Sequence, residues 1–200
     1  MDRPEFSRRR FVSALPLTVL AAPSCLTACE RASEAETLEA APLPILQSQG
    51  PGFVGPLSEE EATAVAASAM AQEIAGLNGK GYPCSEMILL ASLRRFDLPE
   101  NHLDAAAVFG GGVGKRSLCG LLTGGLMAIG IAAGNKYQDR EQVHSLGRTA
   151  SNAYWEWWLT RGDLNCMGPG TEHSNSEEFV RMCQRTAVKV EEIIVEVLKV

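Results

Sequence analysis

Apolar residues recur at intervals of three and four along most of the chain beyond residue 57, which is the spacing of one face of an α-helix. Ser58 followed by Glu61 forms a capping box, an arrangement that commonly opens a helix. This first helix is expected to end near Asn78-Gly79. Its predicted apolar face consists of Ala62, Val65, Ala66, Ala69, Ile74 and Leu77.

Further segments carry the same helical period and are bounded by residues that start or stop helices. The predicted helices cover residues 84 to about 96, 99–109, 117–133, about 140–160 and about 176–198. Pro83 precedes the first of these, and Pro99 begins the second. No segment shows the sustained alternation of apolar and polar residues that a half-buried strand requires. The pattern therefore predicts an all-α fold, a single compact bundle of about five to six helices.

The segment 117–135 has nineteen residues without a charge and is flanked by Lys115, Arg116 and Lys136. A membrane span is one interpretation of such a segment. Its five glycines and few bulky side chains favour another interpretation, because small residues let neighbouring helices approach closely. We predict that it forms the buried central helix, with Ser117 as its N-cap.

The N-terminal residues resemble an export signal. Residues 7–12 (Ser-Arg-Arg-Arg-Phe-Val) match the twin-arginine pattern, in which Arg8 and Arg9 are read by a receptor. The apolar stretch that follows, residues 11–22, is too short to span a bilayer permanently. Residues 1–29 are therefore predicted to be a signal peptide, and the remaining chain to act as a folded, exported domain.

A lipid anchor is a second expectation for the N-terminal region. Residues 26–29 (Leu-Thr-Ala-Cys) resemble a lipobox, in which Cys29 receives lipid and becomes the mature N-terminus. Ordinary cleavage nearby, leaving a soluble protein, is the alternative. Residues 30–57 are rich in Ala, Glu and Pro and are expected to form a flexible linker to a helical domain at 58–200. The predicted location is the periplasm or the outer face of a membrane, with Cys29 as a membrane tether.

Charge and glycine spacing exclude two classes of ligand. The net charge of −6 leaves no basic stripe, so nucleic acid is not an expected partner. Residues 110–115 resemble a phosphate loop, but Phe109 stands where its first glycine is required and Arg116 follows the lysine. The dinucleotide pattern fails as well, so no nucleotide is expected. The run is expected to form a tight turn whose amides are able to hold an anion or a cluster sulfur.

Cysteines in the helical part of the chain give the clearest functional signal. The segments 81–86, 109–114 and 119–124, with the later Cys166 and Cys183, resemble a bacterial family. That family is named for a cysteine, a Gly-Cys-Ala-x-x-Gly element and two more cysteines. Carried over by position, its characteristic cysteines are Cys84, Cys119, Cys166 and Cys183.

The resemblance covers about residues 58–198 and implies a redox-active protein that serves a partner oxidoreductase or electron-transfer protein. It implies no established reaction, and no catalytic residue is assigned. A related domain in an iron–sulfur-containing cytochrome suggests that the four cysteines hold a cluster. This chain departs from the family pattern at Leu118 and Leu121, on either side of Cys119, where small residues are usual.

The predicted helix starts also favour reactive thiols. Cys84 begins one helix, and Cys119 lies two residues after the expected cap Ser117. Amide groups at a helix N-terminus stabilise a thiolate and so lower the pKa of the thiol. Cys166 lies in a loop that contains Gly and Pro, and Cys183 is expected to face inward from the last helix.

Three chemistries stay open for the four thiols. In the first, which we prefer at this point, they ligate an iron–sulfur cluster or another soft metal, for which four cysteines are the usual number. In the second, two of them cycle between dithiol and disulfide. In the third, they form permanent disulfides of a non-enzymatic scaffold or binding domain. Covalent haem is excluded because no Cys-x-x-Cys-His sequence occurs.

Histidines and aromatic residues give weaker indications of function than the cysteines do. The three histidines are scattered, at His102, His144 and His173. Of these, His173 is the best ligand candidate because it lies near Cys166 in sequence. Tyr154 and Trp158 are four residues apart, so they share one helix face and are expected in the core. A docking surface of tyrosine and tryptophan for a redox partner is the alternative.

Overall fold

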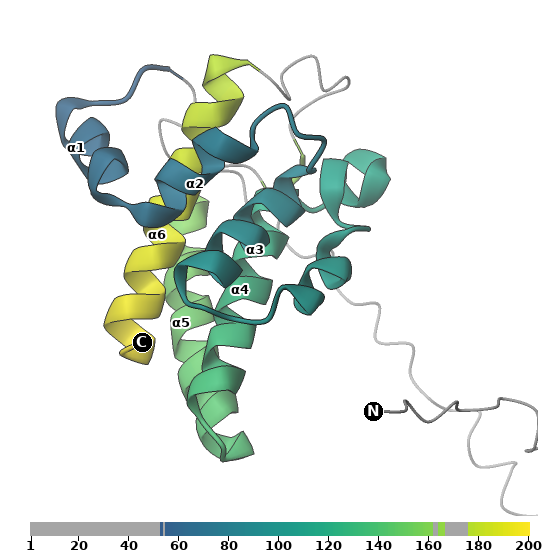
Figure 1. Ribbon diagram of the computed structural model, residues 1–200, viewed down its shortest axis with the longest axis vertical. Helices are drawn as coiled ribbons and strands as arrows, with labels where there is room; N and C mark the ends of the chain where they lie inside the picture. Colours follow the sequence, from purple (N-terminus) through teal and green to yellow (C-terminus); the bar gives the residue numbers. More distant parts are fainter. Residues whose placement is uncertain (1–52, 54, 162–163, 167–175) are drawn as a thin grey trace, which may run out of the picture. The chain divides into compact units, whose positions relative to one another are not determined.

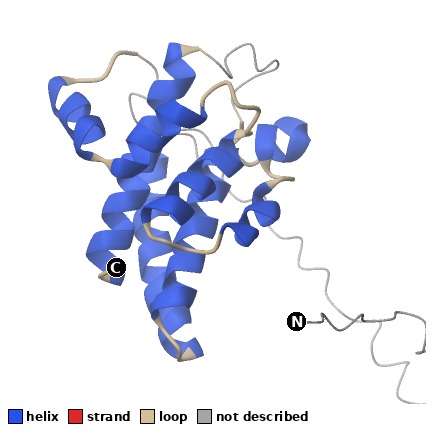
Figure 2. Ribbon diagram, viewed as in Figure 1, coloured by secondary structure: helices blue, strands red, loops and turns tan. Residues whose placement is uncertain are grey.

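The chain folds into helices, and no strand occurs in the part that the structure describes (Figure 1; Figure 2). This computed structural model describes residues 53, 55–161, 164–166 and 176–200, which all belong to one unit, Pro44–Val200. The elements are α1 (Glu59–Ala67), α2 (Ala69–Leu77), α3 (Cys84–Arg95), the 3₁₀ helix η1 (Glu100–Ala106), the π-helical turn η2 (Gly112–Arg116), α4 (Gly120–Lys136), α5 (Arg140–Arg161) and α6 (Glu177–Leu198). The predicted all-α fold is confirmed.

Helix α4 lies at the centre of the fold, in contact with α3, α5 and α6 (Figure 1). Most of its side chains are buried, as predicted for a central helix. Glycines let the neighbours approach: a Cβ on Gly124 would be 2.6 Å from the carbonyl oxygen of Ser85 in α3. On the α5 side, a Cβ on Gly125 would be 2.5 Å from the ring of Tyr154. These two glycines therefore set how closely α3 and α5 pack on α4.

The first predicted helix is in fact two helices, α1 and α2, which meet at Ser68. The capping box of Ser58 and Glu61 opens α1, as expected. Ser68 has an extended backbone, and its side chain accepts a hydrogen bond from the Ala71 amide, so that it caps α2. The Ser68 hydroxyl also donates to the buried carboxylate of Glu191 in α6, 2.6 Å away. The prediction of one continuous helix over this region is therefore wrong. The hydrogen bond from Ser68 to Glu191, which is distant in sequence, stabilises the break between α1 and α2.

The buried face of this helix pair also differs from the predicted one. Its large buried residues are Val65, Met70, Ile74 and Leu77. Three of the predicted core alanines are exposed instead, namely Ala62, Ala66 and Ala69. A single helical period does not apply across the break, so the sequence pattern placed these alanines on the wrong face.

Helix boundaries near α4 need two corrections. The helix predicted for residues 99–109 is only the 3₁₀ helix Glu100–Ala106. Ser117 does not cap α4, because Cys119 is its N-cap residue, with a non-helical backbone at φ −58° and ψ 132°. The Ser117 carbonyl instead accepts a hydrogen bond from the Cys166 amide. The ends of α3, α5 and α6 lie within one residue of their predicted positions.

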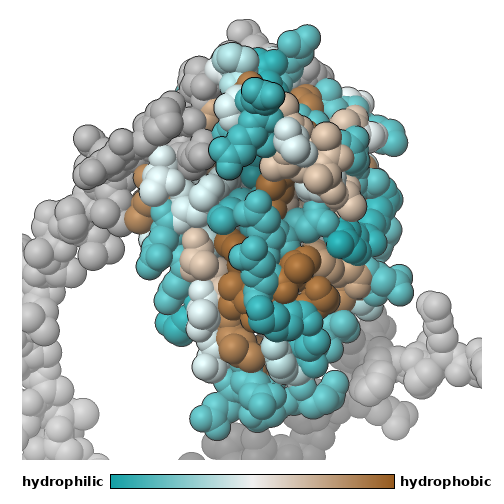
Figure 3. All heavy atoms as spheres, turned by 90° about the vertical axis from the view of Figure 1, so that its left-hand side faces the viewer, coloured by the Kyte–Doolittle hydropathy of each residue, from teal (hydrophilic) through white to brown (hydrophobic). Residues whose placement is uncertain are grey.

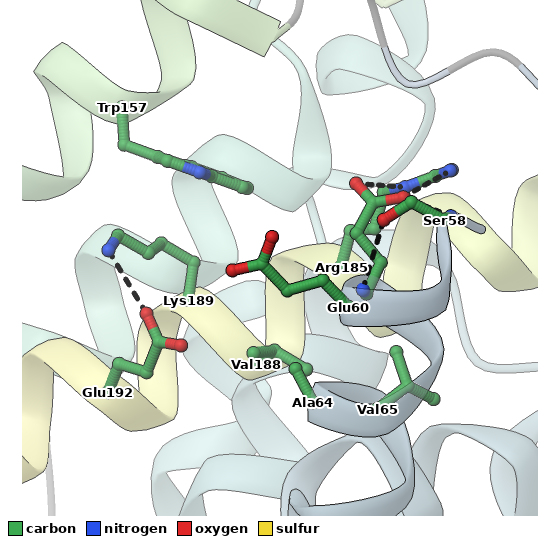
Figure 4. Close-up of a pocket in the computed structure, with 10 residues that line it drawn as sticks. Ser58, Glu60, Ala64, Val65, Trp157, Arg185, Val188, Lys189 and Glu192 are labelled. Carbon is green, nitrogen blue, oxygen red and sulfur yellow. Dashed lines mark hydrogen bonds and ion pairs between the residues drawn. The ribbon is translucent and has the colours of Figure 1, made fainter.

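Helix α6 carries a buried arginine that holds the chain before α1. Arg185 is 7% exposed and donates to both carboxylate oxygens of Glu61. It also donates to the backbone carbonyls of Phe53 and Pro56. Figure 4 shows Arg185 directed toward the start of α1, next to Ser58. The guanidinium therefore joins α6 to α1 and to the segment that precedes it.

A buried glutamate, also on α6, joins three helices. The Glu191 carboxylate accepts hydrogen bonds from the Ser68 hydroxyl and the Met70 amide of α2, and from the Arg95 guanidinium of α3. Burial raises the pKa of this carboxyl group, but the hydrogen bonds from Ser68, Arg95 and Met70 outweigh burial, so the pKa lies below its usual value of 4.5. Glu191 is therefore ionised near neutral pH and links α2, α3 and α6.

The face that carries α1 is mostly hydrophilic, with apolar side chains in small separate groups (Figure 3). Within the described ranges, no helix combines the length and the apolar character that crossing a membrane requires. The predicted signal residues Arg8 and Arg9, the predicted lipidation site Cys29 and nearly all of the linker at 30–57 lie outside the described residues. These N-terminal features therefore stay predictions.

Candidate redox site

Four thiols from four different elements lie near one another around the N-termini of α3 and α4. Cys84 is the first residue of α3, Cys119 is the N-cap of α4, Cys166 lies in the short segment 164–166, and Cys183 lies in α6. All four are free thiols. Cys84 and Cys166 are half-buried, whereas Cys119 and Cys183 are buried. We call these four residues the cysteine cluster.

Close packing of α3 on α4 forms the first part of the cluster. Pro83 precedes α3 with an extended backbone, so the helix begins at Cys84. The Cys84 Sγ atom lies directly against the backbone of Gly120, where a Cβ would be only 2.3 Å from the sulfur. Gly120 follows Cys119 in the chain, so a glycine at this position brings the Cys84 sulfur up to the backbone beside Cys119.

Backbone pairing adds Cys166 to the cluster. The Cys119 amide donates to the Leu164 carbonyl, and the Cys166 amide donates to the Ser117 carbonyl, each over 2.7 Å. These two hydrogen bonds make an isolated antiparallel bridge between residues 117–119 and 164–166. The bridge fixes Cys166 beside the start of α4, although 47 residues separate it from Cys119 in the chain.

The two departures from the family pattern do not loosen this packing. Leu121 is fully buried, and Leu118 is half-buried with its backbone paired to Asn165. The close contacts between α3 and α4 run through Gly120 and Gly124 instead. Larger side chains at the two departing positions therefore leave the approach of the helices intact.

The glycine-rich segment, residues 108–116, borders the cluster in a left-handed conformation. Residues 111–114 all have φ angles between 59° and 63°, so the run forms a left-handed turn that includes the first three residues of η2, rather than a simple tight turn. Gly112 is buried, and a Cβ there would be 2.8 Å from the Cys166 Cβ. Glycine is thus needed at Gly112 for both its φ angle and its contact, whereas Val113 adopts the same φ at a steric cost.

Electrostatics place the four sulfurs in one neighbourhood. Burial is the first cause that raises the pKa of Cys119, Cys166 and Cys183. Repulsion from a thiolate at Cys84 is the second cause for each of them. A charge at Cys84 would therefore be felt at all three of the other thiols.

The low pKa predicted for Cys119 is wrong. Burial, followed by repulsion from Cys84, raises the pKa of the Cys119 thiol to about 12, despite hydrogen bonds from the Leu121 and Leu122 amides. The pKa of Cys183 also lies well above its usual value of 9.0, chiefly because of burial. Burial outweighs the helix N-terminus at Cys119, and no helix N-terminus lies at Cys183, so both buried thiols stay protonated near neutral pH.

Metal binding by this arrangement has no support in the geometry. Among the residues that the structure describes, no three side chains of His, Cys, Asp or Glu lie close enough together to hold a metal ion. The four thiols are neighbours, but in this arrangement they do not form a ready-made shell for a single metal ion. An iron–sulfur cluster on these cysteines therefore stays a prediction from sequence.

The other predicted candidates contribute little. His102 and His144 are exposed, and His173 lies outside the described residues. Tyr154 and Trp158 are buried in the core, as predicted from their spacing. Trp155 and Trp157 are half-buried and pack against that core, so the aromatic residues of α5 mainly serve packing.

Tyr154, predicted to lie in the core, also lies next to the cysteine cluster. Its hydroxyl donates to the Leu121 carbonyl of α4 over 3.0 Å. Burial raises the pKa of Tyr154 well above its usual value, and charges at Cys119 and Cys183 add to the rise. No sequence signal connects this tyrosine with the cysteines, because they lie on different helices.

Comparison with known proteins gives one match. The family model described as "Putative redox-active protein (C_GCAxxG_C_C)" matches residues 82–197, a range that includes the whole cysteine cluster. No curated protein and no solved structure matches the chain. Because the family match covers more than half of the 200 residues, this chain belongs to the C_GCAxxG_C_C family.

Proposed function

We propose that the protein exchanges disulfides with a partner protein, with Cys84 and Cys166 as its working thiols. The observation that supports this proposal is the position of Cys84, a half-buried thiol whose sulfur lies against the backbone of Gly120, next to Cys119 at the start of α4. A thiol in that position has neighbours with which to form a disulfide after it has reacted. Membership of a family described as redox-active agrees with this chemistry.

Accessibility selects the working pair. A thiol attacks a disulfide as the thiolate, and the disulfide must be able to reach it. Cys84 and Cys166 are half-buried, whereas Cys119 and Cys183 are buried and stay protonated. Burial and Cys84 raise the pKa of Cys166, but the Arg116 guanidinium acts in the opposite direction. Cys119 and Cys183 are therefore the inner thiols of the cluster.

The proposed exchange moves two electrons and two protons and needs no further cofactor. The Cys84 thiolate attacks one sulfur of the partner disulfide, whose S–S bond breaks and releases the other sulfur as a thiolate. Cys166 then loses its proton and attacks the Cys84 sulfur, which forms the Cys84–Cys166 bond and releases the partner's remaining sulfur. The partner disulfide is reduced to a dithiol while the two cysteines are oxidised, and a reducing partner drives the reverse reaction.

Thiol mapping tests the working pair. Brief alkylation of the reduced protein, followed by peptide mass spectrometry, should modify Cys84 and Cys166 about tenfold faster than the two inner thiols. Oxidation in a glutathione buffer should then give a Cys84–Cys166 bond. The variant Cys166→Ser should lose this bond, and the matched variant Cys183→Ser should keep it. Equal alkylation of all four thiols, or a bond between the two inner thiols alone, would contradict the proposal.

An iron–sulfur cluster or another soft metal on the four cysteines is the competing function, since four cysteine ligands are the usual number. Under the exchange proposal, protein produced with added iron and purified without oxygen should show neither visible absorbance nor stoichiometric iron. Stoichiometric iron that disappears in Cys84→Ser would replace disulfide exchange with electron transfer by a bound cluster.

We further propose that the exchange takes place outside the cytoplasm, at a lipid tether on Cys29. Partner disulfides persist in that oxidising compartment, and the twin-arginine pattern at Arg8 and Arg9 supports export. Cell fractionation of the double variant Arg8→Lys and Arg9→Lys should find the protein retained in the cytoplasm. Cys29→Ala should shift the exported protein from the membrane to the soluble fraction. An unchanged location in the arginine variant would exclude this export route.

A further inference from the structure

Exposed apolar side chains are few in the described part of the chain, and two of them belong to the glycine-rich segment beside the cysteine cluster. Val108 is 67% exposed and Val113 is 44% exposed. The other two exposed large apolar residues, Val195 and Val200, lie near the C-terminus. The neighbourhood of the thiols therefore offers apolar surface that the rest of the fold does not cover.

The backbone at Val113 makes this exposure unusual. Its φ angle of 59° is left-handed, a conformation that β-branched residues rarely adopt. The glycines on either side adopt the same conformation without a steric cost. A glycine at position 113 would remove this backbone strain. The valine therefore lowers the stability of the fold while its side chain is exposed at the surface.

The same segment touches the working thiols. Gly112 lies against the Cβ of Cys166, and the Phe109 carbonyl oxygen would be 3.1 Å from a Cβ on Gly120, the residue that contacts the Cys84 sulfur. The segment thus borders the surroundings of both half-buried thiols.

Positive charge accompanies the apolar side chains. Lys115 and Arg116 are exposed at the end of the segment, and neither forms an ion pair within the described residues. The Arg116 guanidinium is near enough to Cys166 to act on that thiol. Lys115 and Arg116 therefore add exposed positive charge at the end of the segment that borders Cys166.

The geometry points to the glycine-rich segment as the docking surface of the working thiols, where Lys115 and Arg116 select a disulfide that carries negative charge and the two valines contact its apolar groups. This inference rests on the proposed disulfide exchange and specifies its substrate. The partner is then a protein whose reactive disulfide is bordered by acidic and apolar residues.

Small disulfides of opposite charge test the selection directly. The reduced protein is mixed at low salt with dithiodipropionate, which is anionic, hydroxyethyl disulfide, which is neutral, or cystamine, which is cationic. We expect the anionic disulfide to react about three- to tenfold faster than the cationic one, once the intrinsic rates measured with free cysteine are divided out. High salt should reduce this ratio toward one.

Matched variants test whether the glycine-rich segment is responsible for the preference among disulfides. Arg116→Glu should abolish or reverse the preference, whereas Arg148→Glu, which makes the same charge change at an exposed position on α5, should preserve it. Val108→Ser should slow the reaction with the anionic aromatic disulfide of dithiobis(nitrobenzoate) about twofold or more, relative to dithiodipropionate. Val195→Ser, an exposed valine on α6, is its control and should change nothing.

Two negative results have different meanings. If none of the disulfides reacts with the reduced protein, the proposed exchange function fails. If all three react at rates that match their intrinsic reactivity, and Arg116→Glu behaves as Arg148→Glu does, exchange stands but the glycine-rich segment is not a selective docking surface.

Discussion

Helix α6 carries buried ionised groups, and the cysteine cluster contains buried thiols. The two regions differ in how many protein groups hydrogen-bond to the buried side chain. Arg185 and Glu191 each have several hydrogen-bond partners drawn from two or three elements. Burial of a charge is tolerated there because its lost hydration is replaced by protein groups. For the buried thiols Cys119 and Cys183, no cation among the described residues offsets burial, and burial raises their pKa values.

This contrast separates stability from chemistry. The charges on α6 stay ionised and join helices, so their removal is expected to unfold or loosen the protein. The cluster combines neutral inner thiols, two accessible thiols and a strained loop, a combination that adds little stability but suits reaction with a partner. Variants of the two regions, compared with the protein kept reduced, distinguish these roles.

The largest expected effect comes from the buried arginine. Arg185→Met should lower the free energy of unfolding by about 3 kcal/mol, because Glu61 and the backbone carbonyls would lose their charged partner. Arg181→Met, one turn earlier on α6, removes an ion pair with the exposed Glu177 and should cost less than about 0.5 kcal/mol. Urea unfolding followed by circular dichroism measures both, and equal losses would show that burial does not distinguish the two arginines.

A smaller loss is expected where α3 meets α4. Gly124→Ala should cost about 2 kcal/mol, because its Cβ would be 2.6 Å from the Ser85 carbonyl oxygen and must push the helices apart. Gly130→Ala lies on the same helix with open space around it and should add about 0.5 kcal/mol through its higher helix propensity. The same unfolding experiment compares them, and a stabilising Gly124→Ala would refute the close contact.

The buried glutamate gives a pH-dependent prediction. Glu191→Gln should cost about 1.5 kcal/mol at pH 7, since the hydrogen bonds to the carboxylate are charge-assisted. The pKa of Glu191 is lowered in the folded protein, so the stabilisation from its ionised form is complete above 4.5 and is lost as the pH falls through the folded value.

The gap between wild type and Glu191→Gln in free energy of unfolding should therefore narrow between pH 5 and pH 2, roughly the range over which a lowered carboxyl pKa titrates. Other carboxylates titrate in both proteins and cancel in the difference. A gap that widens at acid pH would mean that burial, and not hydrogen bonding, dominates at this site.

The smallest expected effect is a gain at the strained loop. Val113→Gly should raise the free energy of unfolding by about 1 kcal/mol, because glycine adopts the left-handed φ without a steric cost. Gly111→Ala, at φ 60° and with open space around it, should lose a similar amount, about 1 kcal/mol. If Val113→Gly destabilises the protein, the backbone at position 113 is not strained. The contrast between stabilising charges on α6 and a strained segment beside the cysteine cluster would then be lost.

Local signals explain which parts of the fold were predictable. The capping serine Ser176, the capping box at Ser58 and the proline before Cys84 each act within one helical turn, so α1, α3 and α6 begin where the sequence places them. The uncharged, glycine-rich character of α4 likewise indicated a buried helix. The inward position of Cys183 followed from the apolar stripe of the last helix.

Distant contacts explain what the sequence missed. The break at Ser68 depends on a hydrogen bond with Glu191, 123 positions away. The pairing of residues 117–119 with 164–166 uses only backbone groups, so no side-chain pattern marks it. The left-handed run at 111–114 was hidden because glycine permits either hand. Cys119 was assigned a low pKa because its helix position was visible in the sequence and its burial was not.

The isolated bridge that positions Cys166 has a consequence for amide hydrogen exchange. The amide hydrogens of Cys119 and Cys166 are each bonded to a carbonyl on the opposite segment, so one separation of the two segments exposes both to water. Their protection factors should therefore report one common free energy of opening, although peptides far apart in the chain report it. A bound partner that stabilises the pairing of the two segments would slow deuterium uptake at both amides by the same factor. Binding would then be detected in two peptides that are far apart in the chain.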